Sequence, residues 1–278
     1  MIFFDNKSIS TYLLPLLLFL AILPMNTIDA QDNKQNIINH LQDTSLFQAH
    51  RYVSNSTVLP FRLYRSQKAN SQFSVPLVVF LHGAGERGDD NYRQLKHCVK
   101  YFLDDTITGR YPFLLLVPQC PEGKRWVNTD WNLPSHQMES EPTVELQAVM
   151  AVVDSLIGCG AVDPTRVYIS GISMGGFGVW DALQRWPDRF VAAIAICGGG
   201  DPSYSDRMKD LPIYIFHGLK DSVVLPSRSI QMYEALKASG SHDYLLITYP
   251  NFNHQCWDQA FSTPGLFYWL FGNKKTTK

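Results

Sequence analysis

Short apolar runs alternate with stretches of helical periodicity along this sequence, and that alternation restricts the fold class. Each run is apolar on both faces and ends at Gly, Pro or a charged residue. The runs are 77–81, 114–117, 167–170, 192–197, 213–216 and 244–249. Such strands belong to parallel sheets that helices cover on both faces. We therefore expect an α/β fold with a mostly parallel, twisted sheet.

Stretches with helical periodicity lie between these runs. Apolar residues recur at helical spacing over 146–157, and Pro142 and Gly158 suit the start and the end of a helix there. Further helices are expected over 175–186, 230–236 and 255–270, the last broken at Pro264-Gly265. Two antiparallel edge strands are expected upstream, at 51–53 and 60–65.

Two long stretches have the composition of loops. Residues 119–141 combine Pro, Gly and Asn with Trp126 and Trp131. Residues 198–210 read GGGDPSYSDRMKD and connect two predicted strands. Because that connection is short, we expect no separate cap domain.

The N-terminal segment has the features of a signal peptide. The apolar run from Tyr12 to Pro24 is shorter than the roughly 20 residues of a membrane-spanning helix. Lys7 precedes it, and Ala30 provides a small residue for cleavage. We expect cleavage of 1–30 and export to the periplasm or beyond, without stable membrane insertion afterwards. An uncleaved membrane anchor is the alternative.

The composition excludes several classes of protein. The 278 residues are 45% hydrophobic and 18% charged, with a net charge of -1, so the chain is neither disordered nor strongly basic. Binding to nucleic acid is therefore not expected. After the signal peptide, we expect an N-terminal segment at 31–49, one α/β domain at 50–273 and a polar tail at 274–278.

The cysteines form no recognisable ligand pattern. Their number is odd and no CxxC occurs, so neither a metal site nor a redox motif is predicted. Cys197 lies in the apolar run AAIAIC and is expected to be a buried small hydrophobic residue. Disulfide pairing stays open among the five, which are Cys98, Cys120, Cys159, Cys197 and Cys256.

One pentapeptide carries the strongest chemical signal. Residues 171–175 read GISMG and match G-x-S-x-G, directly after a predicted strand and before a predicted helix. In this context the sharp turn exposes Ser173, and the flanking glycines avoid clashes. We interpret Ser173 as a nucleophile; the alternative is an ordinary strand-to-helix turn.

A serine hydroxyl needs an adjacent base, and the chain order Ser, acid, His indicates the partners. His254 lies between the last predicted strand and the last predicted helix, as expected for the base. Asp221 follows the strand at 213–216 and would orient His254 and stabilise its imidazolium form.

Other histidines and carboxylates remain alternatives. His217 ends a strand and is expected to be structural, and His242 lies on a predicted surface turn. The remaining alternatives are His40, His50, His97 and His136 for the base, and Asp201, Asp206, Asp210 and Asp243 for the acid.

A third element would stabilise an oxyanion. The sequence HGAG follows the strand at 77–81, and its small residues let backbone N–H groups approach a developing negative charge. The expected donors are the N–H groups of Ala84 and Met174. His82 is expected to be structural. Glu86 and Arg87 are expected to pair and order the turn, and a direct role in binding substrate is the alternative.

Five segments resemble the α/β-hydrolases, in particular secreted feruloyl and acetylxylan esterases, polyester depolymerases and "predicted peptidases". They are PLVVFLHGAGERGDDN (76–91), VPQCPEGKRW (117–126), DPTRVYISGISMGGFGVWDAL (163–183), IFHGLKDSVV (215–224) and NFNHQCW (251–257). The resemblance implies esterase chemistry on acyl groups without a metal or organic cofactor.

We therefore expect a secreted serine esterase that works through an acyl-enzyme. Trp126 and Trp131 follow a strand at the edge where such sheets bind ligands, and they could stack on a sugar or a cinnamoyl ring. Alternatively, both rings anchor the loop to the core. Feruloyl or acetyl esters on polysaccharide are the expected substrates. The alternatives are a serine peptidase of the same fold and an inactive carbohydrate-binding relative.

Overall fold

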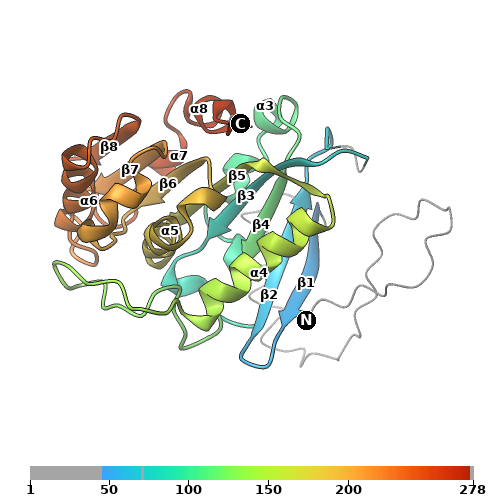
Figure 1. Ribbon diagram of the computed structural model, residues 1–278, viewed down its shortest axis with the longest axis horizontal. Coiled ribbons are helices and arrows are strands. Elements are labelled where there is room, and N and C mark those ends of the chain that lie inside the picture. Colours follow the sequence, from blue (N-terminus) through green and yellow to red (C-terminus); the bar gives the residue numbers. More distant parts are fainter. Residues whose placement is uncertain (1–45, 70–71, 276–278) are drawn as a thin grey trace.

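The computed structural model describes residues 46–69 and 72–275, drawn in colour in Figure 1. The predicted signal peptide at 1–30 lies outside the described residues. The centre is an eight-stranded sheet with the strand order β1-β2-β4-β3-β5-β6-β7-β8. The strands are β1 (Phe47–Val53), β2 (Val58–Arg65), β3 (Val75–Leu81), β4 (Leu114–Pro118), β5 (Val162–Ile172), β6 (Ala192–Ile196), β7 (Ile213–Gly218) and β8 (Tyr244–Tyr249).

The sheet is parallel except at one side. From β4 to β8 every neighbouring pair of strands is parallel, whereas β2 is antiparallel to both β1 and β4. The expected mostly parallel sheet is therefore confirmed. The expectation of two edge strands is wrong for β2, because β2 pairs on both sides and only β1 lies at that edge.

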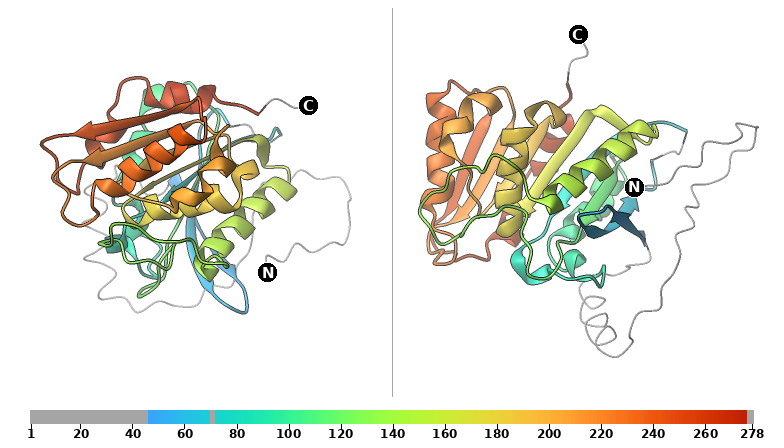
Figure 2. Two further views of the ribbon diagram at one scale, coloured as in Figure 1. Left: turned by 60° about the vertical axis from the view of Figure 1, so that its left-hand side comes forward. Right: turned by 60° about the horizontal axis from the view of Figure 1, so that its bottom comes forward.

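Helices cover both faces of the sheet (Figure 2). The α-helices are α2 (Val99–Phe102), α3 (Asp105–Thr108), α4 (Val144–Gly158), α5 (Met174–Arg185), α6 (Ser227–Ala238), α7 (Trp257–Phe261) and α8 (Leu266–Gly272). Short 3₁₀ helices are η2 (Ala84–Glu86), η3 (Arg93–Leu95), η4 (Pro187–Arg189) and η5 (Pro202–Met208). One core lies between the sheet and α4, α5 and α6, and the other lies between the sheet and α2, α7 and α8.

The central strands supply both cores by alternation. Along β3, Leu77, Val79 and Leu81 pack toward α4 and α5, while Val78 and Phe80 pack toward α2 and α7. Successive side chains of a strand point to opposite faces, so a strand buried on both sides must be apolar throughout. This explains why the runs in the sequence show no polar alternation.

Local signals set the helix ends. Thr143 caps α4 by accepting a hydrogen bond from the Leu146 N–H at 3.2 Å. Pro142 therefore precedes the cap instead of lying in the first turn, which differs from the expectation for this helix start. The expected break in the last helix is present, because Gly265 adopts φ 78° between α7 and α8. That conformation suits a residue without Cβ.

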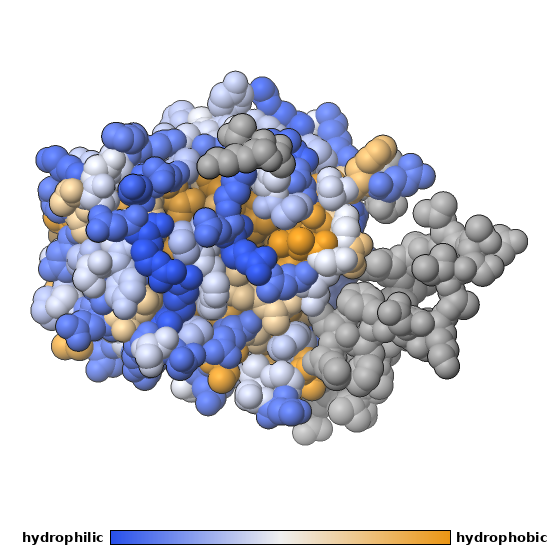
Figure 3. Space-filling model, viewed as in Figure 1, coloured by the Kyte–Doolittle hydropathy of each residue, from blue (hydrophilic) through white to orange (hydrophobic). Residues whose placement is uncertain are grey.

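Residues 119–141 form a long loop, as expected, and 198–210 contain only η5 between β6 and β7. The space-filling view shows mostly hydrophilic residues on the face that α4, α5 and α6 cover, with small apolar areas between them (Figure 3). Among the described residues, every helix is too short or too polar to cross a bilayer.

Candidate active site

The turn after β5 holds Ser173 in a strained conformation. Its φ of 54° and ψ of −120° lie outside the regions that side chains usually adopt. The Ser173 N–H donates a hydrogen bond to the Ile196 carbonyl at 2.9 Å, which ties the turn to the end of β6. Strain of this kind persists only where the surroundings fix it, and it is common at functional sites.

Two glycines of the pentapeptide make this turn sterically possible. A Cβ on Gly175 would lie 1.9 Å from the Leu81 carbonyl oxygen, and a Cβ on Gly171 would lie 2.4 Å from the Gly175 oxygen. Both contacts are with backbone atoms, which no side-chain rotation can relieve. The G-x-S-x-G pattern is therefore required for α5 to start against β3 with Ser173 between them.

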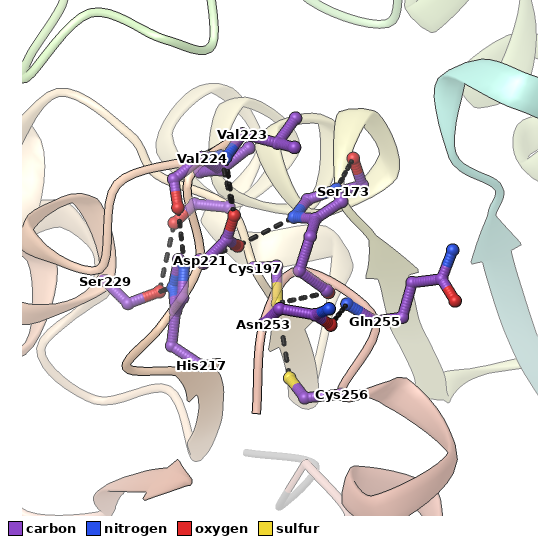
Figure 4. A network of polar contacts seen from close by, with 12 residues as sticks. Ser173, Cys197, His217, Asp221, Val223, Val224, Ser229, Asn253, Gln255 and Cys256 are labelled. Carbon is purple, nitrogen blue, oxygen red and sulfur yellow. Dashed lines mark hydrogen bonds and ion pairs between the residues drawn. The ribbon is translucent and has the colours of Figure 1, made fainter. Parts of the chain in front are cut away.

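Ser173, His254 and Asp221 form a continuous chain of hydrogen bonds (Figure 4). The His254 Nε2 lies 2.8 Å from the Ser173 Oγ. The His254 Nδ1 lies 2.7 Å from the Asp221 Oδ2. The structure thus brings together three groups that are widely separated in sequence, in the geometry that nucleophile, base and acid require.

The Asp221 carboxylate is held by donors from several directions (Figure 4). Its Oδ1 accepts hydrogen bonds from the Val223 and Val224 N–H groups, both at 2.9 Å. Its Oδ2 lies 3.1 Å from the His217 Nε2 as well as near His254. Burial raises the pKa of Asp221, but hydrogen bonds from His217, His254 and Val224 outweigh burial and hold this pKa well below its ordinary value.

His217 is a partner of Asp221 that the sequence interpretation missed. The side chain is fully buried at the end of β7, and its Nε2 also lies 2.9 Å from the Val224 carbonyl. Both Nε2 neighbours are acceptors, so this nitrogen carries a proton. Its Nδ1 lies 2.7 Å from the Ser229 Oγ. The spacing of four residues between His217 and Asp221 is the sequence feature that could have indicated this contact.

Two rival residues are engaged elsewhere. Asp201 caps η5 by accepting from the Ser203 N–H, and it also accepts from the Met138 N–H. His136 contacts the buried guanidinium of Arg228.

The predicted oxyanion donors lie next to Ser173. Ala84 is the first residue of η2 and Met174 is the first residue of α5, so neither N–H has an acceptor within its own helix. η2 follows β3 and α5 follows β5, and these strands are parallel neighbours. A Cβ on Gly83 would lie 3.7 Å from the Ser173 Cβ, which shows how closely the two turns approach.

Trp126 is not available to a ligand. Its side chain is fully buried, and its Nε1–H donates to the His82 carbonyl at 3.1 Å. His82 is also structural, because its Nε2 accepts the Cys120 N–H and its Nδ1 donates to the Gly83 carbonyl. Burial lowers the pKa of His82 to about 4. The expectation that Trp126 stacks on substrate is therefore wrong, and the ring anchors the turn that carries Ala84.

Glu86 and Arg87 do not pair with each other as expected. The Glu86 carboxylate is buried and lies 3.5 Å from the His97 Nε2. The Arg87 Nε donates instead to the Ala84 carbonyl at 2.8 Å. Burial raises the pKa of Glu86 to about 7. Both side chains still order the turn, but through different partners.

A cleft of about 350 Å³ opens beside Ser173. Its wall includes Ser173, His254 and Ala84, together with Trp131 and Trp257. Trp131 is half-buried, and the Arg125 guanidinium lies 4.6 Å from the centre of its ring. The cleft is therefore polar at the reacting groups and aromatic at its sides.

Comparisons with known proteins agree with this architecture. The family model described as "Prolyl oligopeptidase family" matches residues 130–214 and 202–264. A crystal structure of a thermostable esterase superimposes with a TM-score of 0.76 and 33% identity, over 83% of this chain and 64% of that one.

The chain has the α/β-hydrolase fold. Two curated relatives are similar over about half of its length. The bifunctional acetylxylan esterase/xylanase XynS20E of Neocallimastix patriciarum is 28% identical over 151 residues, which are 54% of this chain and 20% of the relative. The poly(3-hydroxyalkanoate) depolymerase C of Paucimonas lemoignei is 25% identical over 150 residues, which are 53% and 34%. This chain thus spans only about a third or less of the curated relatives.

Proposed function

We propose that this α/β-hydrolase is an exported serine esterase that cleaves carboxylic esters through an acyl-enzyme. The observation that carries the proposal is the hydrogen-bond chain from Ser173 through His254 to Asp221. Similarity to an acetylxylan esterase, a polyester depolymerase and a thermostable esterase supports ester substrates.

The tautomer of His254 determines its chemistry. Asp221 is ionised and can only accept, so the His254 Nδ1 carries the proton and donates to it. The Nε2 lone pair then faces the Ser173 hydroxyl and accepts its proton as Oγ attacks the ester carbonyl. Asp221 stabilises the imidazolium that results.

The oxyanion formed in this attack would lie between the Ala84 and Met174 N–H groups. Losing one such donor costs about 3 kcal/mol of transition-state stabilisation. The His254 imidazolium then returns the proton to the leaving alcohol, and the acyl group stays on Ser173. Water repeats the sequence in the second half-reaction and releases the acid.

The cleft suits an acyl or alcohol group with a ring. Trp131 and Trp257 provide aromatic walls beside Ser173, and pockets of a few hundred Å³ enclose small-molecule ligands. Feruloyl and acetyl esters on polysaccharide are therefore the proposed substrates. The match to the prolyl oligopeptidase family favours a peptidase as the second candidate.

A fluorophosphonate probe and a substrate panel test these proposals together. We expect the probe to label the purified chain, and Ser173→Ala to abolish labelling while the circular-dichroism spectrum is unchanged. The panel contains feruloyl, acetyl-xylo-oligosaccharide and 3-hydroxyalkanoate esters and a peptide anilide. Faster cleavage of the anilide than of every ester would support the peptidase, and unlabelled wild-type protein would refute both candidates.

The pH profile tests the role of His254. Only the neutral imidazole can accept the Ser173 proton, so kcat/KM should fall on acidification. Ester hydrolysis that is constant between about pH 5 and 8 would contradict this role.

A further inference from the structure

Two buried cysteines meet directly behind the active site. The Sγ atoms of Cys197 and Cys256 lie 3.3 Å apart, and both residues are 0% exposed (Figure 4). Cys197 directly follows β6, and Cys256 is two residues after His254. Both are linked to the His254 carbonyl, which accepts from the Cys256 N–H at 3.1 Å and lies 3.4 Å from the Cys197 Sγ.

The backbone at Cys197 is unusual for a residue with a side chain. Its φ is 49°, in the left-handed region where glycine is favoured, and the next three residues are all glycine. A strained conformation persists only where the surrounding structure over-determines it. The Cys197 N–H donates to the Phe216 carbonyl at 2.9 Å, so β7 helps to hold the backbone in this conformation.

The other three cysteines show no such pairing. All five cysteines are among the described residues, and Cys197 and Cys256 are the pair whose sulfur atoms are within hydrogen-bond distance of each other. Cys98 and Cys120 are buried in the core, and the exposed Cys159 donates to the Leu156 carbonyl on the preceding helix. If the chain forms one disulfide, the short distance between the sulfur atoms favours Cys197 and Cys256 as its two cysteines.

We infer that Cys197 and Cys256 form a disulfide when the chain folds in the presence of a small-molecule disulfide such as oxidised glutathione. One thiolate attacks the oxidant, and the first glutathione leaves as a thiol. The second cysteine then displaces the other glutathione. The two cysteines lose two electrons and two protons in total, and oxidised glutathione takes them up to become two molecules of reduced glutathione. The two sulfur atoms, which lie 3.3 Å apart as thiols, approach to about 2.05 Å when the bond forms.

The bond acts on the active site through the loop of His254. It fixes Cys256, at the start of α7, to the end of β6, where the Ile196 carbonyl already holds the Ser173 N–H. The hydrogen bond between the two thiols and their burial raise the pKa of Cys197 well above its ordinary value, which suppresses the reactive thiolate in the folded protein. Oxidation should therefore accompany folding, and the finished bond should resist external reductants.

Mass spectrometry of the whole chain tests this inference without any measurement of activity. The protein is refolded in a glutathione redox buffer, denatured without reductant and treated with iodoacetamide. We expect three modified cysteines. The mass should be two hydrogen atoms below that of the reduced chain with three carbamidomethyl groups. Digestion should yield a cross-linked peptide pair that contains Cys197 and Cys256. Five modified cysteines, or a cross-link between any other pair, would overturn the inference.

Matched variants separate this bond from general effects of removing a thiol. Cys197→Ala and Cys256→Ala should each leave four modifiable cysteines and no cross-link, whereas Cys120→Ala should keep the cross-link and leave two. We also expect the oxidised wild type to retain its fold longer than the reduced protein at elevated temperature, measured by circular dichroism. Equal unfolding rates would show that the bond does not clamp this region and would refute that part of the inference.

Discussion

Replacing Gly175 by alanine gives the sharpest test of how the turn at Ser173 is built. The new Cβ would lie 1.9 Å from the Leu81 oxygen and 2.8 Å from the His82 oxygen, both backbone atoms of the neighbouring strand and turn. Since real Cβ atoms essentially never come within 3.0 Å of such a neighbour, the start of α5 must move away from β3 by about 1 Å.

This displacement should affect both activity and stability. Ser173 and Met174 move with α5, whereas Ala84 stays with β3. The proposed nucleophile and the Met174 N–H therefore shift relative to the Ala84 N–H, the other proposed oxyanion donor. A misplacement of about 1 Å can cost ~100-fold in rate, or about 2.7 kcal/mol. Overpacking typically costs about 1–3 kcal/mol, and at the upper end Tm should fall by roughly 6–12 °C in a domain of this size.

The control is a glycine that has free space around it. Gly158 ends α4, and no atom outside its own helix lies within 4 Å of the place that a Cβ would take, so Gly158→Ala should keep kcat/KM and leave Tm equal or higher. Hydrolysis of a p-nitrophenyl ester and thermal denaturation by circular dichroism measure both quantities. If Gly175→Ala had the wild-type kcat/KM and Tm, the steric reasoning about the pentapeptide would be refuted.

Three further predictions address the surroundings of the site. Trp131→Ala should raise KM for feruloyl esters several-fold, whereas Trp126→Phe should lower the unfolding free energy by about 1 kcal/mol and leave KM unchanged, because only Trp131 lines the cleft; the opposite pattern in steady-state kinetics would contradict this assignment. Burial raises the pKa of Glu86 to about 7, so the folded state binds its proton more tightly and stability falls as pH rises from about 4 to 7. Glu86→Gln should therefore unfold at higher urea concentration than wild type at pH 8 and show less difference at pH 5; an equal difference at both pH values would exclude this linkage. His217→Leu removes a donor from Asp221, which makes the carboxylate a stronger acceptor and should move the acid limb of kcat/KM to higher pH. His217→Gln offers an N–H in its place and should restore the wild-type pH profile. Identical profiles for the two variants would show that His217 does not act through Asp221.

The strand pattern and the chain order of the site could be predicted from the sequence. A strand buried on both faces has to be apolar throughout, and β3, β4 and β6 show this directly. Ser173, Asp221 and His254 each follow the end of a parallel strand, and parallel strands end at one edge of the sheet. Position along the chain therefore predicted proximity in space for these three residues.

Side chains within one loop could not be sorted in the same way. Trp126 and Trp131 share a residue type and a loop, yet only tertiary contacts decide that Trp126 is buried against His82. The partner of Glu86 is His97 instead of its sequence neighbour, because the turn directs the carboxylate inward. The short helices α2 and α3 have too few residues to show a period.

The proposed acid, Asp221, and the proposed base, His254, lie on loops that hydrogen-bond to each other. The Leu219 N–H donates to the Tyr249 carbonyl and the Lys220 N–H to the Phe252 carbonyl, so the pairing of β7 with β8 continues beyond both strands. If β7 and β8 move away from the rest of the sheet, Asp221 and His254 should therefore move together as one rigid unit. The hydrogen bond between Asp221 and His254 would persist, and the hydrogen bond between His254 and Ser173 would break first. Gradual heating should therefore abolish activity at a temperature at which Asp221 and His254 are still hydrogen-bonded to each other.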